Sequence, residues 1–197
     1  MASVATSRPV IVLASGSPRR RELLARLGLP HRVEPPSVDE SVAPGEDPTD
    51  AARRLAQLKV RSTPGAWVLA ADTVVAVDGR ILGKPRDLAE NRRFLELLSG
   101  RDHWVHTGLA LRAPAGATAL VSSTRVRFRK LADWEIAAYA ASGEGLDKAG
   151  GYGIQEKGMV LVEAVEGDFF TVMGLPVARL WEALARLGYP LAEVWDA

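Results

Sequence analysis

The sequence predicts one α/β domain built on a long mixed β-sheet with helices beside it. At 197 residues, 47% of them hydrophobic, the chain is long enough to fill one core. Short β-branched apolar runs alternate with segments whose apolar residues recur at helical spacing. These strands and helices lack the strict βα alternation of a doubly wound sheet, which favours a mixed sheet. Residues 1–9 are expected to form a flexible tail and residues 10–197 the domain.

The first elements meet at a sharp turn. Residues 10–14 form an apolar, partly β-branched run that predicts a buried strand. Ser17 and Pro18 predict a helix start, because hydroxyl side chains are favoured N-caps and proline is favoured at the first helical position. Gly28 is placed to end that helix. The chain therefore turns from strand to helix at residues 15–17.

The remaining elements follow from the same signals. A weak strand is expected at 31–34 and a helix from Pro48 or Thr49 to about residue 61. A buried strand at 67–71 is expected to deliver Asp72 and Thr73 at its end. Asp-Gly at 78–79 predicts a type I′ hairpin between 74–77 and 80–82. Further along, we expect a helix at 87–98, extended segments at 104–111 and 118–128, a helix at 133–141, a strand at 159–165 and a closing helix at 175–187.

Charge and cysteine content exclude several functions. The chain has 25 basic and 24 acidic side chains, so no bulk field would hold a nucleic-acid polymer or an anionic membrane. It has no cysteine, which removes disulfides and thiolate catalysis. The first apolar run is shorter than a signal-peptide core or a membrane span. We therefore expect a cytoplasmic protein with neither nucleic-acid polymers nor membranes as partners.

Arginines crowd the first turn of the helix that begins near residue 18. Arg19, Arg20 and Arg21 lie where the helix dipole favours carboxylates, by about 0.3–1 kcal/mol per charge. A turn of small residues, free N–H groups at a helix start and guanidinium groups together make a good phosphate site. A solvated arginine face on an ordinary amphipathic helix is the alternative. The Ser-Gly-Ser-Pro turn favours the phosphate site.

Carboxylates and lysines supply the other candidate chemistry, since P-loop, dinucleotide-binding and His-Glu-x-x-His motifs are absent from the sequence. Asp72 follows an apolar strand, where a carboxylate can be aimed rigidly, while Lys84 and Lys148 lie in a turn and a glycine-rich loop. Taken singly, turn capping explains Asp72 and solvent exposure explains the lysines. Together with the arginines, they describe a polyanion site whose carboxylate holds a divalent cation or accepts a proton from water.

Three more side chains have an ordinary structural explanation, and two of them also have a functional one. Glu40 is either a second carboxylate of the site or part of an exposed acidic loop. Gln155 can donate and accept hydrogen bonds, which suits reading a base edge or satisfying loop backbone. Lys59 lies in the last turn of its predicted helix, where a favourable contact with the helix dipole is the commoner explanation.

Several motifs carry a family resemblance, in order, across about residues 10–187. They are Leu-Ala-Ser-Gly-Ser-Pro-Arg-Arg at 13–20, Val-Asp-Glu at 38–40, Ala-Asp-Thr at 71–73, Gly-Lys-Pro at 83–85, Ser-Thr at 123–124 with Val126 and Phe128, Asp-Lys-Ala-Gly at 147–150, Gly-Ile-Gln at 153–155 and Gly-Leu-Pro at 174–176. Together they resemble the Maf-type nucleoside triphosphate pyrophosphatases.

The resemblance implies a cytoplasmic enzyme that hydrolyses a nucleoside triphosphate to the monophosphate and pyrophosphate, with a divalent cation, Mg or Mn, as cofactor. It also implies an elongated mixed sheet flanked by helices, similar to that of inosine triphosphate pyrophosphatases, and a homodimer. By motif, Asp72 is the proton acceptor that activates water, and Glu40 and Asp72 hold the metal. Substrate specificity falls to Arg19, Thr73 and Gln155, and phosphate binding to Ser15, Ser17, Arg20, Lys59, Lys84 and Lys148.

The stretch 147–155 resembles the subgroup that acts on dTTP and UTP. Gly151 departs from its pattern, since alanine is usual there, and Thr171 stands where Asn is frequent. The subgroup that acts on 7-methyl-GTP is one alternative, and a non-catalytic nucleotide-binding regulator of cell division, which would not need Asp72, is another. An aspartyl-phosphate phosphatase is disfavoured, because Val74 stands where that mechanism needs a second acid. The family resemblance further implies removal of noncanonical nucleotides and an association with arrest of cell division.

Overall fold

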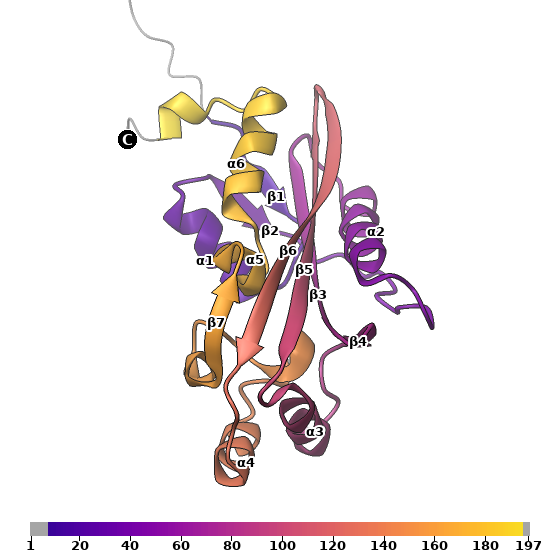
Figure 1. Ribbon diagram of the computed structural model, residues 1–197. Helices are drawn as coiled ribbons and strands as arrows, with labels where there is room; N and C mark the ends of the chain where they lie inside the picture. Colours follow the sequence, from indigo (N-terminus) through magenta and orange to yellow (C-terminus); the bar gives the residue numbers. More distant parts are fainter. Residues whose placement is uncertain (1–7, 195–197) are drawn as a thin grey trace, which may run out of the picture.

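The computed structural model describes residues 8–194, which form an elongated mixed α/β fold (Figure 1). Within them, a seven-stranded sheet has the order β2-β1-β3-β5-β6-β7, and β4 pairs with β3. The pairings β1–β2 and β1–β3 are parallel and the others antiparallel, which confirms the predicted mixed sheet. The strands are β1 Ile11–Leu13, β2 His31–Val33, β3 Val68–Val77, β4 Arg80–Leu82, β5 Asp102–Ala113, β6 Gly116–Phe128 and β7 Val162–Glu166.

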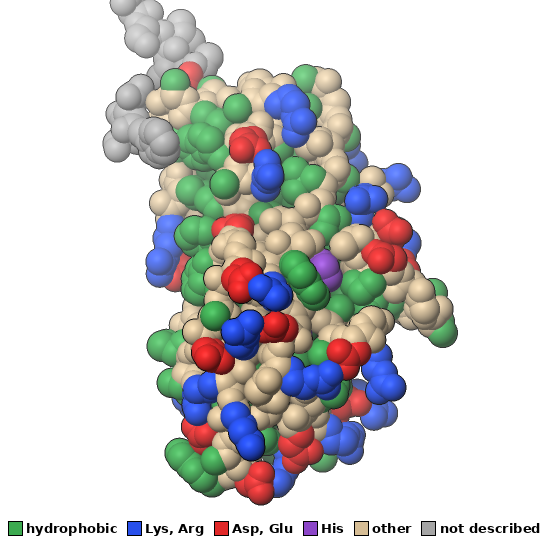
Figure 2. All heavy atoms as spheres, in the orientation of Figure 1, with side chains coloured by type: hydrophobic (Ala, Val, Ile, Leu, Met, Phe, Trp, Pro, Cys, Tyr) green, Lys and Arg blue, Asp and Glu red, His purple; other side chains and the backbone are tan. Residues whose placement is uncertain are grey.

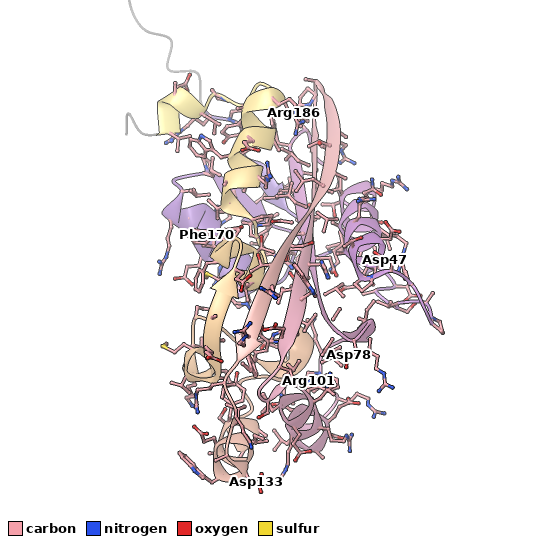
Figure 3. The ribbon with its side chains drawn as sticks, viewed as in Figure 1. Asp47, Asp78, Arg101, Asp133, Phe170 and Arg186 are labelled. Atoms are coloured by element: carbon pink, nitrogen blue, oxygen red, sulfur yellow. The ribbon has the colours of Figure 1, made fainter. Side chains whose placement is uncertain are left out.

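Helices cover both faces of this sheet. α2 lies on one face, α1, α5 and α6 lie on the other, and α3 and α4 sit at one end of the long strands (Figure 1). Figure 3 shows the same division, with Asp47 at the start of α2 and Phe170 in α5 on opposite sides of the sheet. The helices are α1 Pro18–Arg26, α2 Pro48–Arg61, α3 Leu88–Leu98, α4 Asp133–Ala141, α5 Phe169–Met173 and α6 Val177–Arg186, with 3₁₀ turns η1 Ala149–Gly151, η2 Lys157–Leu161 and η3 Leu191–Val194.

Two main hydrophobic cores divide the long strands between them. The first joins α1 and α6 to one half of the sheet and includes Leu13, Leu24, Leu69, Leu111 and Leu184. The second joins α3 and α4 to the other half and includes Val75, Leu95, Val105, Phe128 and Ile136. Strand β3 contributes to both cores, so the middle of β3 lies at their boundary.

Helix α2 packs unusually close to the sheet. Its inner face carries the buried side chains of Ala51, Ala52 and Ala56, which are small enough to let the backbones approach. On β5, a Cβ atom at Gly108 would lie only 2.1 Å from the Ala52 carbonyl oxygen. Gly108 is the register partner of Asp72 on β3. The first turns of α2 are therefore held close to the sheet, beside the middle of β3.

Local signals confirm several predicted boundaries. Asp47 caps α2 by accepting hydrogen bonds from the backbone N–H groups of Thr49 and Asp50. The β3–β4 hairpin has Asp78 and Gly79 at φ 49° and 73°, as a type I′ turn requires. An ion pair between Asp78 and Arg101 joins this turn to the chain just before β5 (Figure 3).

Other predicted boundaries are wrong. β3 does not end before Asp72 but continues to Val77, because β5 pairs with it from Val68 to Ala76. The strand expected at 159–165 begins at Val162, since Lys157–Leu161 forms a 3₁₀ turn. The short helix α5 was not predicted.

Hydrogen bonds join the two ends of the described chain. Residues 1–7 of the predicted tail and residues 195–197 lie outside the described part of the chain. The Arg8 guanidinium donates to the Glu193 carbonyl at 3.3 Å, and the Pro9 carbonyl accepts from the Tyr189 hydroxyl at 2.7 Å. Between residues 8 and 194, no helix combines the length and apolar character needed to cross a membrane.

Candidate functional site

A gap in the sheet lies beside the middle of β3. β1 pairs with β3 only at Val68 and Leu69, and β4 pairs with it only from Val75 onward. Residues 70–74 thus have β5 along one edge and no strand along the other. A cleft of about 760 Å³ opens here. Its lining includes every side chain predicted for the site: Ser15, Ser17, Arg19, Arg20, Glu40, Lys59, Asp72, Thr73, Lys84, Lys148 and Gln155.

Two carboxylates meet one ammonium group on the α2 side of the cleft. Lys59 Nζ lies 2.6 Å from Asp72 Oδ1 and 2.9 Å from Glu40 Oε2. Lys59 and Asp72 are buried, with 6% and 7% of their surfaces exposed, whereas the Glu40 side chain is about half exposed. A contact with the helix dipole therefore does not account for Lys59 by itself. It holds the predicted proton acceptor and the second predicted metal ligand together.

The opposite face of β3 presents Thr73 to a buried arginine, because successive strand residues point to opposite faces. Arg20 donates from Nη2 to Thr73 Oγ1 at 3.2 Å, from Nη1 to Ser15 Oγ at 2.9 Å and from Nε to the Gly174 carbonyl at 2.7 Å. Burial lowers the pKa of Arg20, and the charge of Asp72 opposes that shift. Arg20 thus joins α1, β3 and the end of α5 at the floor of the cleft.

The start of α1 faces the cleft. Ser17 is the N-cap residue of α1, but its side chain makes no capping hydrogen bond. Its backbone N–H instead donates to Ser15 Oγ at 3.2 Å. Since Ser15 also accepts from Arg20, the structure uses the Ser15 hydroxyl to hold the turn. The Ser17 hydroxyl is not used in capping.

A loop after α4 forms the other wall and carries Lys148 and Gln155. Lys148 is buried, and its Nζ donates to Asp147 Oδ1 at 2.7 Å and to the Glu144 carbonyl at 2.6 Å. Gln155 is half-buried, and its Nε2 donates to Glu156 Oε1 at 3.1 Å. Lys84, in contrast, is exposed at the cleft and makes no ion pair with the residues that the structure describes.

Asp147 lines the cleft, although no role was predicted for it. Its Oδ2 lies 3.4 Å from Arg19 Nη1, so it connects α1 to the loop that carries Lys148. Burial acts to raise the pKa of Asp147, but the hydrogen bond and charge of Lys148 and the charge of Arg19 outweigh it, and the pKa is lowered. The only signal in the sequence was its place directly before Lys148 in the Asp-Lys-Ala-Gly motif.

Asn91 accounts for the glycine at position 151. Asn91 lies on α3, is fully buried, and donates from Nδ2 to the Gly151 carbonyl at 2.7 Å. A Cβ at Gly151 would lie 2.2 Å from that same Nδ2, and Gly151 has φ 75°. The asparagine amide thus fills the space that an alanine methyl group would need. The departure from the subgroup pattern at position 151 is therefore explained by the packing of Asn91 behind the loop.

Two carboxylates of the cleft, Glu40 and Asp72, could hold a divalent cation together with substrate phosphates. Among residues 8–194, no group of three or more His, Cys, Asp or Glu side chains could hold a metal ion. Glu40 and Asp72 nevertheless converge on one positive charge. Mg²⁺ is commonly bound by one or two carboxylates, with substrate phosphates and water as its other ligands.

Comparison with known sequences identifies the family. The model of the Maf-like protein family matches residues 10–187. The chain belongs to the Maf-like family. One of its relatives is a dTTP/UTP pyrophosphatase of Thermus thermophilus, 53% identical over 93% of this chain and 98% of the relative. Another Maf-like relative, a dTTP/UTP pyrophosphatase of Deinococcus radiodurans, is 48% identical over 93% of this chain and 96% of its own.

Among solved structures, that of the Staphylococcus aureus Ham1 protein matches this Maf-like chain with a TM-score of 0.43 and 14% sequence identity. The match covers 63% of this chain and 72% of the other. A TM-score of this size is too low to support a conclusion about mechanism or substrate.

Proposed function

We propose that this Maf-like chain hydrolyses dTTP and UTP to the monophosphates and pyrophosphate. The observation that carries the proposal is the cleft at the edge of β3, where Asp72 lies among the lysines and arginines of α1, α2 and the loop after α4. A triphosphate needs several positive groups, and its hydrolysis needs an acceptor for the proton of the attacking water. The names and high identity of the relatives support the choice of dTTP and UTP.

In this mechanism, a water molecule attacks the α-phosphorus without a covalent enzyme intermediate. Lys59 orients Asp72 through Oδ1 at 2.6 Å, and Oδ2 makes no hydrogen bond with the described residues. Asp72 Oδ2 takes the proton as the new P–O bond forms. The bond between the α-phosphorus and its bridging oxygen breaks, and pyrophosphate leaves with the electron pair.

The basic groups around Asp72 bind the phosphates and the leaving pyrophosphate. Lys84 supplies an exposed ammonium, while Lys148 and Arg19 share Asp147 until a polyanion competes for them. Charge-assisted hydrogen bonds of this kind are strongest where they are desolvated. Glu40 and Asp72 would hold Mg²⁺ or Mn²⁺, which neutralises charge on the phosphate oxygens when bound. Thr73, Arg19 and Gln155 would recognise the rest of the nucleotide.

A substrate panel tests the proposal. Canonical and modified triphosphates, including 7-methyl-GTP, are incubated with the protein and Mg²⁺ or Mn²⁺, and pyrophosphate, orthophosphate and monophosphate are measured separately. We expect dTTP and UTP to be hydrolysed fastest, with one pyrophosphate per monophosphate. Orthophosphate as the product, preference for 7-methyl-GTP, or nucleotide binding without turnover would each overturn the proposal.

The cellular setting belongs to the same proposal. We place the enzyme in the cytoplasm as a homodimer that removes noncanonical nucleotides and is associated with arrest of cell division. Sedimentation equilibrium measures the oligomeric state directly, and a monomer at all concentrations would contradict the dimer.

A further inference from the structure

Glu144, in the turn after α4, accepts hydrogen bonds from three donors, one on α4 and two in η2. The Tyr139 hydroxyl donates to Oε1 at 2.9 Å, and the backbone N–H of Gly158 donates to the same oxygen at 3.0 Å. The backbone N–H of Lys157 donates to Oε2 at 3.0 Å. The carboxylate therefore joins the end of α4 to the start of η2, beyond the loop that forms the cleft wall.

Tyr139 extends this network into the loop itself. Its hydroxyl is buried and accepts the backbone N–H of Gly153 at 3.0 Å while it donates to Glu144. Burial raises the pKa of Tyr139, so the hydroxyl stays protonated and keeps its donor for the carboxylate. The packing around it is tight, because a Cβ at Gly158 would lie 2.6 Å from the Gly153 carbonyl oxygen.

Both predicted ligand-binding side chains of the loop depend on this network. The Glu144 carbonyl accepts Lys148 Nζ at 2.6 Å, so the backbone of Glu144 orients that ammonium. Gln155 lies between Gly153 and Lys157, whose N–H groups are held by Tyr139 and Glu144. Glu144 thus contacts Lys148 and the chain after Gln155, and its partner Tyr139 holds the chain before Gln155.

We infer that Glu144 is a positioning residue that, through Tyr139, sets the places of Lys148 and Gln155 relative to each other in the cleft. The inference rests on the proposed function for its substrate. Glu144 itself does not line the cleft. It acts on binding and base selection, whereas the Asp72–Lys59 pair on the opposite wall is untouched.

The chemistry requires a carboxylate of this length. Three donors converge on Glu144, and an ionised carboxylate has acceptors only. A glutamine in its place keeps one acceptor oxygen. Its NH₂ group replaces the other oxygen and would point at a hydrogen-bond donor, so that donor would lose its acceptor. Glu144→Gln therefore preserves the size of the side chain and removes the acceptor function from one end.

The experiment compares Glu144→Gln and Tyr139→Phe with the control Glu135→Gln. Glu135 also accepts a backbone N–H, that of Ala132 at 2.9 Å, and binds Arg129, but it lies on α4 outside the cleft lining. With dTTP and Mg²⁺, we expect Glu144→Gln to raise KM about 10-fold, the cost of losing one hydrogen bond to a charged group. We expect kcat to change less than about 3-fold, because Asp72 and Lys59 keep their contacts.

Base selection gives a second readout. The kcat/KM ratio for dTTP over GTP should fall in Glu144→Gln and, by less, in Tyr139→Phe, but not in Glu135→Gln. Hydrogen exchange of the amides at 153–158 should accelerate in the first two variants only. Should Glu144→Gln fail to fold, Tyr139→Phe, which removes a single hydroxyl, decides the question.

The results separate the two proposals. An unchanged KM and dTTP-to-GTP ratio in Glu144→Gln and Tyr139→Phe, or a loss of kcat at constant KM, would overturn the positioning role. A wild-type protein that forms no pyrophosphate from dTTP or UTP would overturn the proposed function instead. Exchange at 153–158 would then still decide whether Glu144 holds the loop, and unaltered exchange would reject it.

Discussion

The two walls of the cleft are built in different ways. On one wall, Asp72 and Thr73 lie in the middle of β3, whose backbone is paired with β5 for nine residues from Val68 to Ala76. On the other, Lys148 and Gln155 lie on an irregular loop that polar side chains hold in place. A group that must meet a reacting atom gains from a backbone that cannot shift. A loop is the more adaptable support for groups that recognise a ligand.

The comparison divides the expected effects of substitution. Changes on the strand wall should act on the chemical step and on global stability, because the charges there are buried in the centre of the sheet. Changes behind the loop wall should act on substrate binding and on local order, and on stability where they affect a buried side chain such as His103 or Asn91.

Asp72→Asn breaks the strand wall at its reactive group. If Asp72 accepts the proton from water, kcat for dTTP should fall at least about 100-fold, the lower end of the contribution of a general base. Pyrophosphate release measures the rate. Asp78→Asn in the exposed hairpin turn is the control and should retain wild-type activity, since asparagine tolerates a positive φ. A kcat within 10-fold of wild type for Asp72→Asn would reject the assigned role.

Acid should weaken the support of the loop wall through His103. This side chain is buried, and its Nε2 lies 2.8 Å from the hydroxyl of Tyr152, which lines the cleft. Burial lowers the pKa of His103 from 6.5 to about 4. Between those values the unfolded chain binds a proton that the folded chain does not, so stability falls as the pH drops, by about 3 kcal/mol in total.

Urea unfolding at several pH values, for wild type and His103→Gln, measures this contribution. The wild-type free energy of unfolding should decrease more steeply between pH 6.5 and 4 than that of the variant. The difference in slope should correspond to about one proton. Parallel pH profiles would show that His103 is not buried in its neutral form.

Lys59→Met removes the cation that holds Asp72 and Glu40. Breaking a buried ion pair costs about 3–5 kcal/mol. Because Glu40 is about half exposed to solvent, we expect a smaller loss, about 2 kcal/mol, in the free energy of unfolding. Urea titration provides the value. Lys84→Met, an exposed lysine of the same cleft, is the matched control and should change stability by less than about 0.5 kcal/mol. Equal losses of stability in both variants would show that the buried ion pairs of Lys59 do not stabilise the strand wall.

Gly151→Ala tests the packing behind the loop. The added Cβ would collide with Asn91 Nδ2 at a residue with φ 75°, and we expect a loss of about 1–2 kcal/mol. In Asn91→Ala/Gly151→Ala, the methyl group has room, so the double variant should be more stable than the sum of the single effects implies. A double-mutant cycle measures this coupling. Strict additivity would show that the two side chains do not compete for space.

Much of the fold could be predicted because its signals are local. The Asp-Gly turn at 78–79 and the helix starts at Pro18 and Pro48 each depend on neighbours in sequence. The apolar run at 159–161 led to a wrong strand prediction, because Met159 and Val160 are more than half exposed in a 3₁₀ turn. Hydrophobicity alone does not distinguish such a turn from a strand.

The end of β3 was misplaced for a different reason. Two adjacent polar residues interrupt an apolar run, which is typical of a strand that has ended. In the structure, the strand continues because Lys59 meets Asp72 on one face and Arg20 meets Thr73 on the other. These partners lie 13 and 53 residues away in the chain, so nothing in the local pattern indicates them.

The cleft residues themselves were predicted from their motifs, and the structure places all of them around one cavity. Their detailed roles remain predictions. The supporting residues Asp147, Glu144 and Asn91 could not be assigned, because their partners are backbone groups or side chains that only the folded chain brings near. A buried asparagine or a half-buried glutamate has no distinctive pattern in a single sequence.

The contact between α2 and Gly108 has a consequence for how this protein can change. A lysine side chain has a fixed reach, so the separation of helix and sheet decides whether its ammonium arrives at the aspartate. Gly108, opposite Asp72, and the alanines of α2 set that separation, because their small size lets the helix lie close to the sheet. A larger residue at any of these positions would lift the helix and leave Lys59 short. These residues have no reactive group, yet the reaction depends on them. In descendants of this sequence they could vary only as far as the distance between helix and sheet still lets Lys59 reach Asp72.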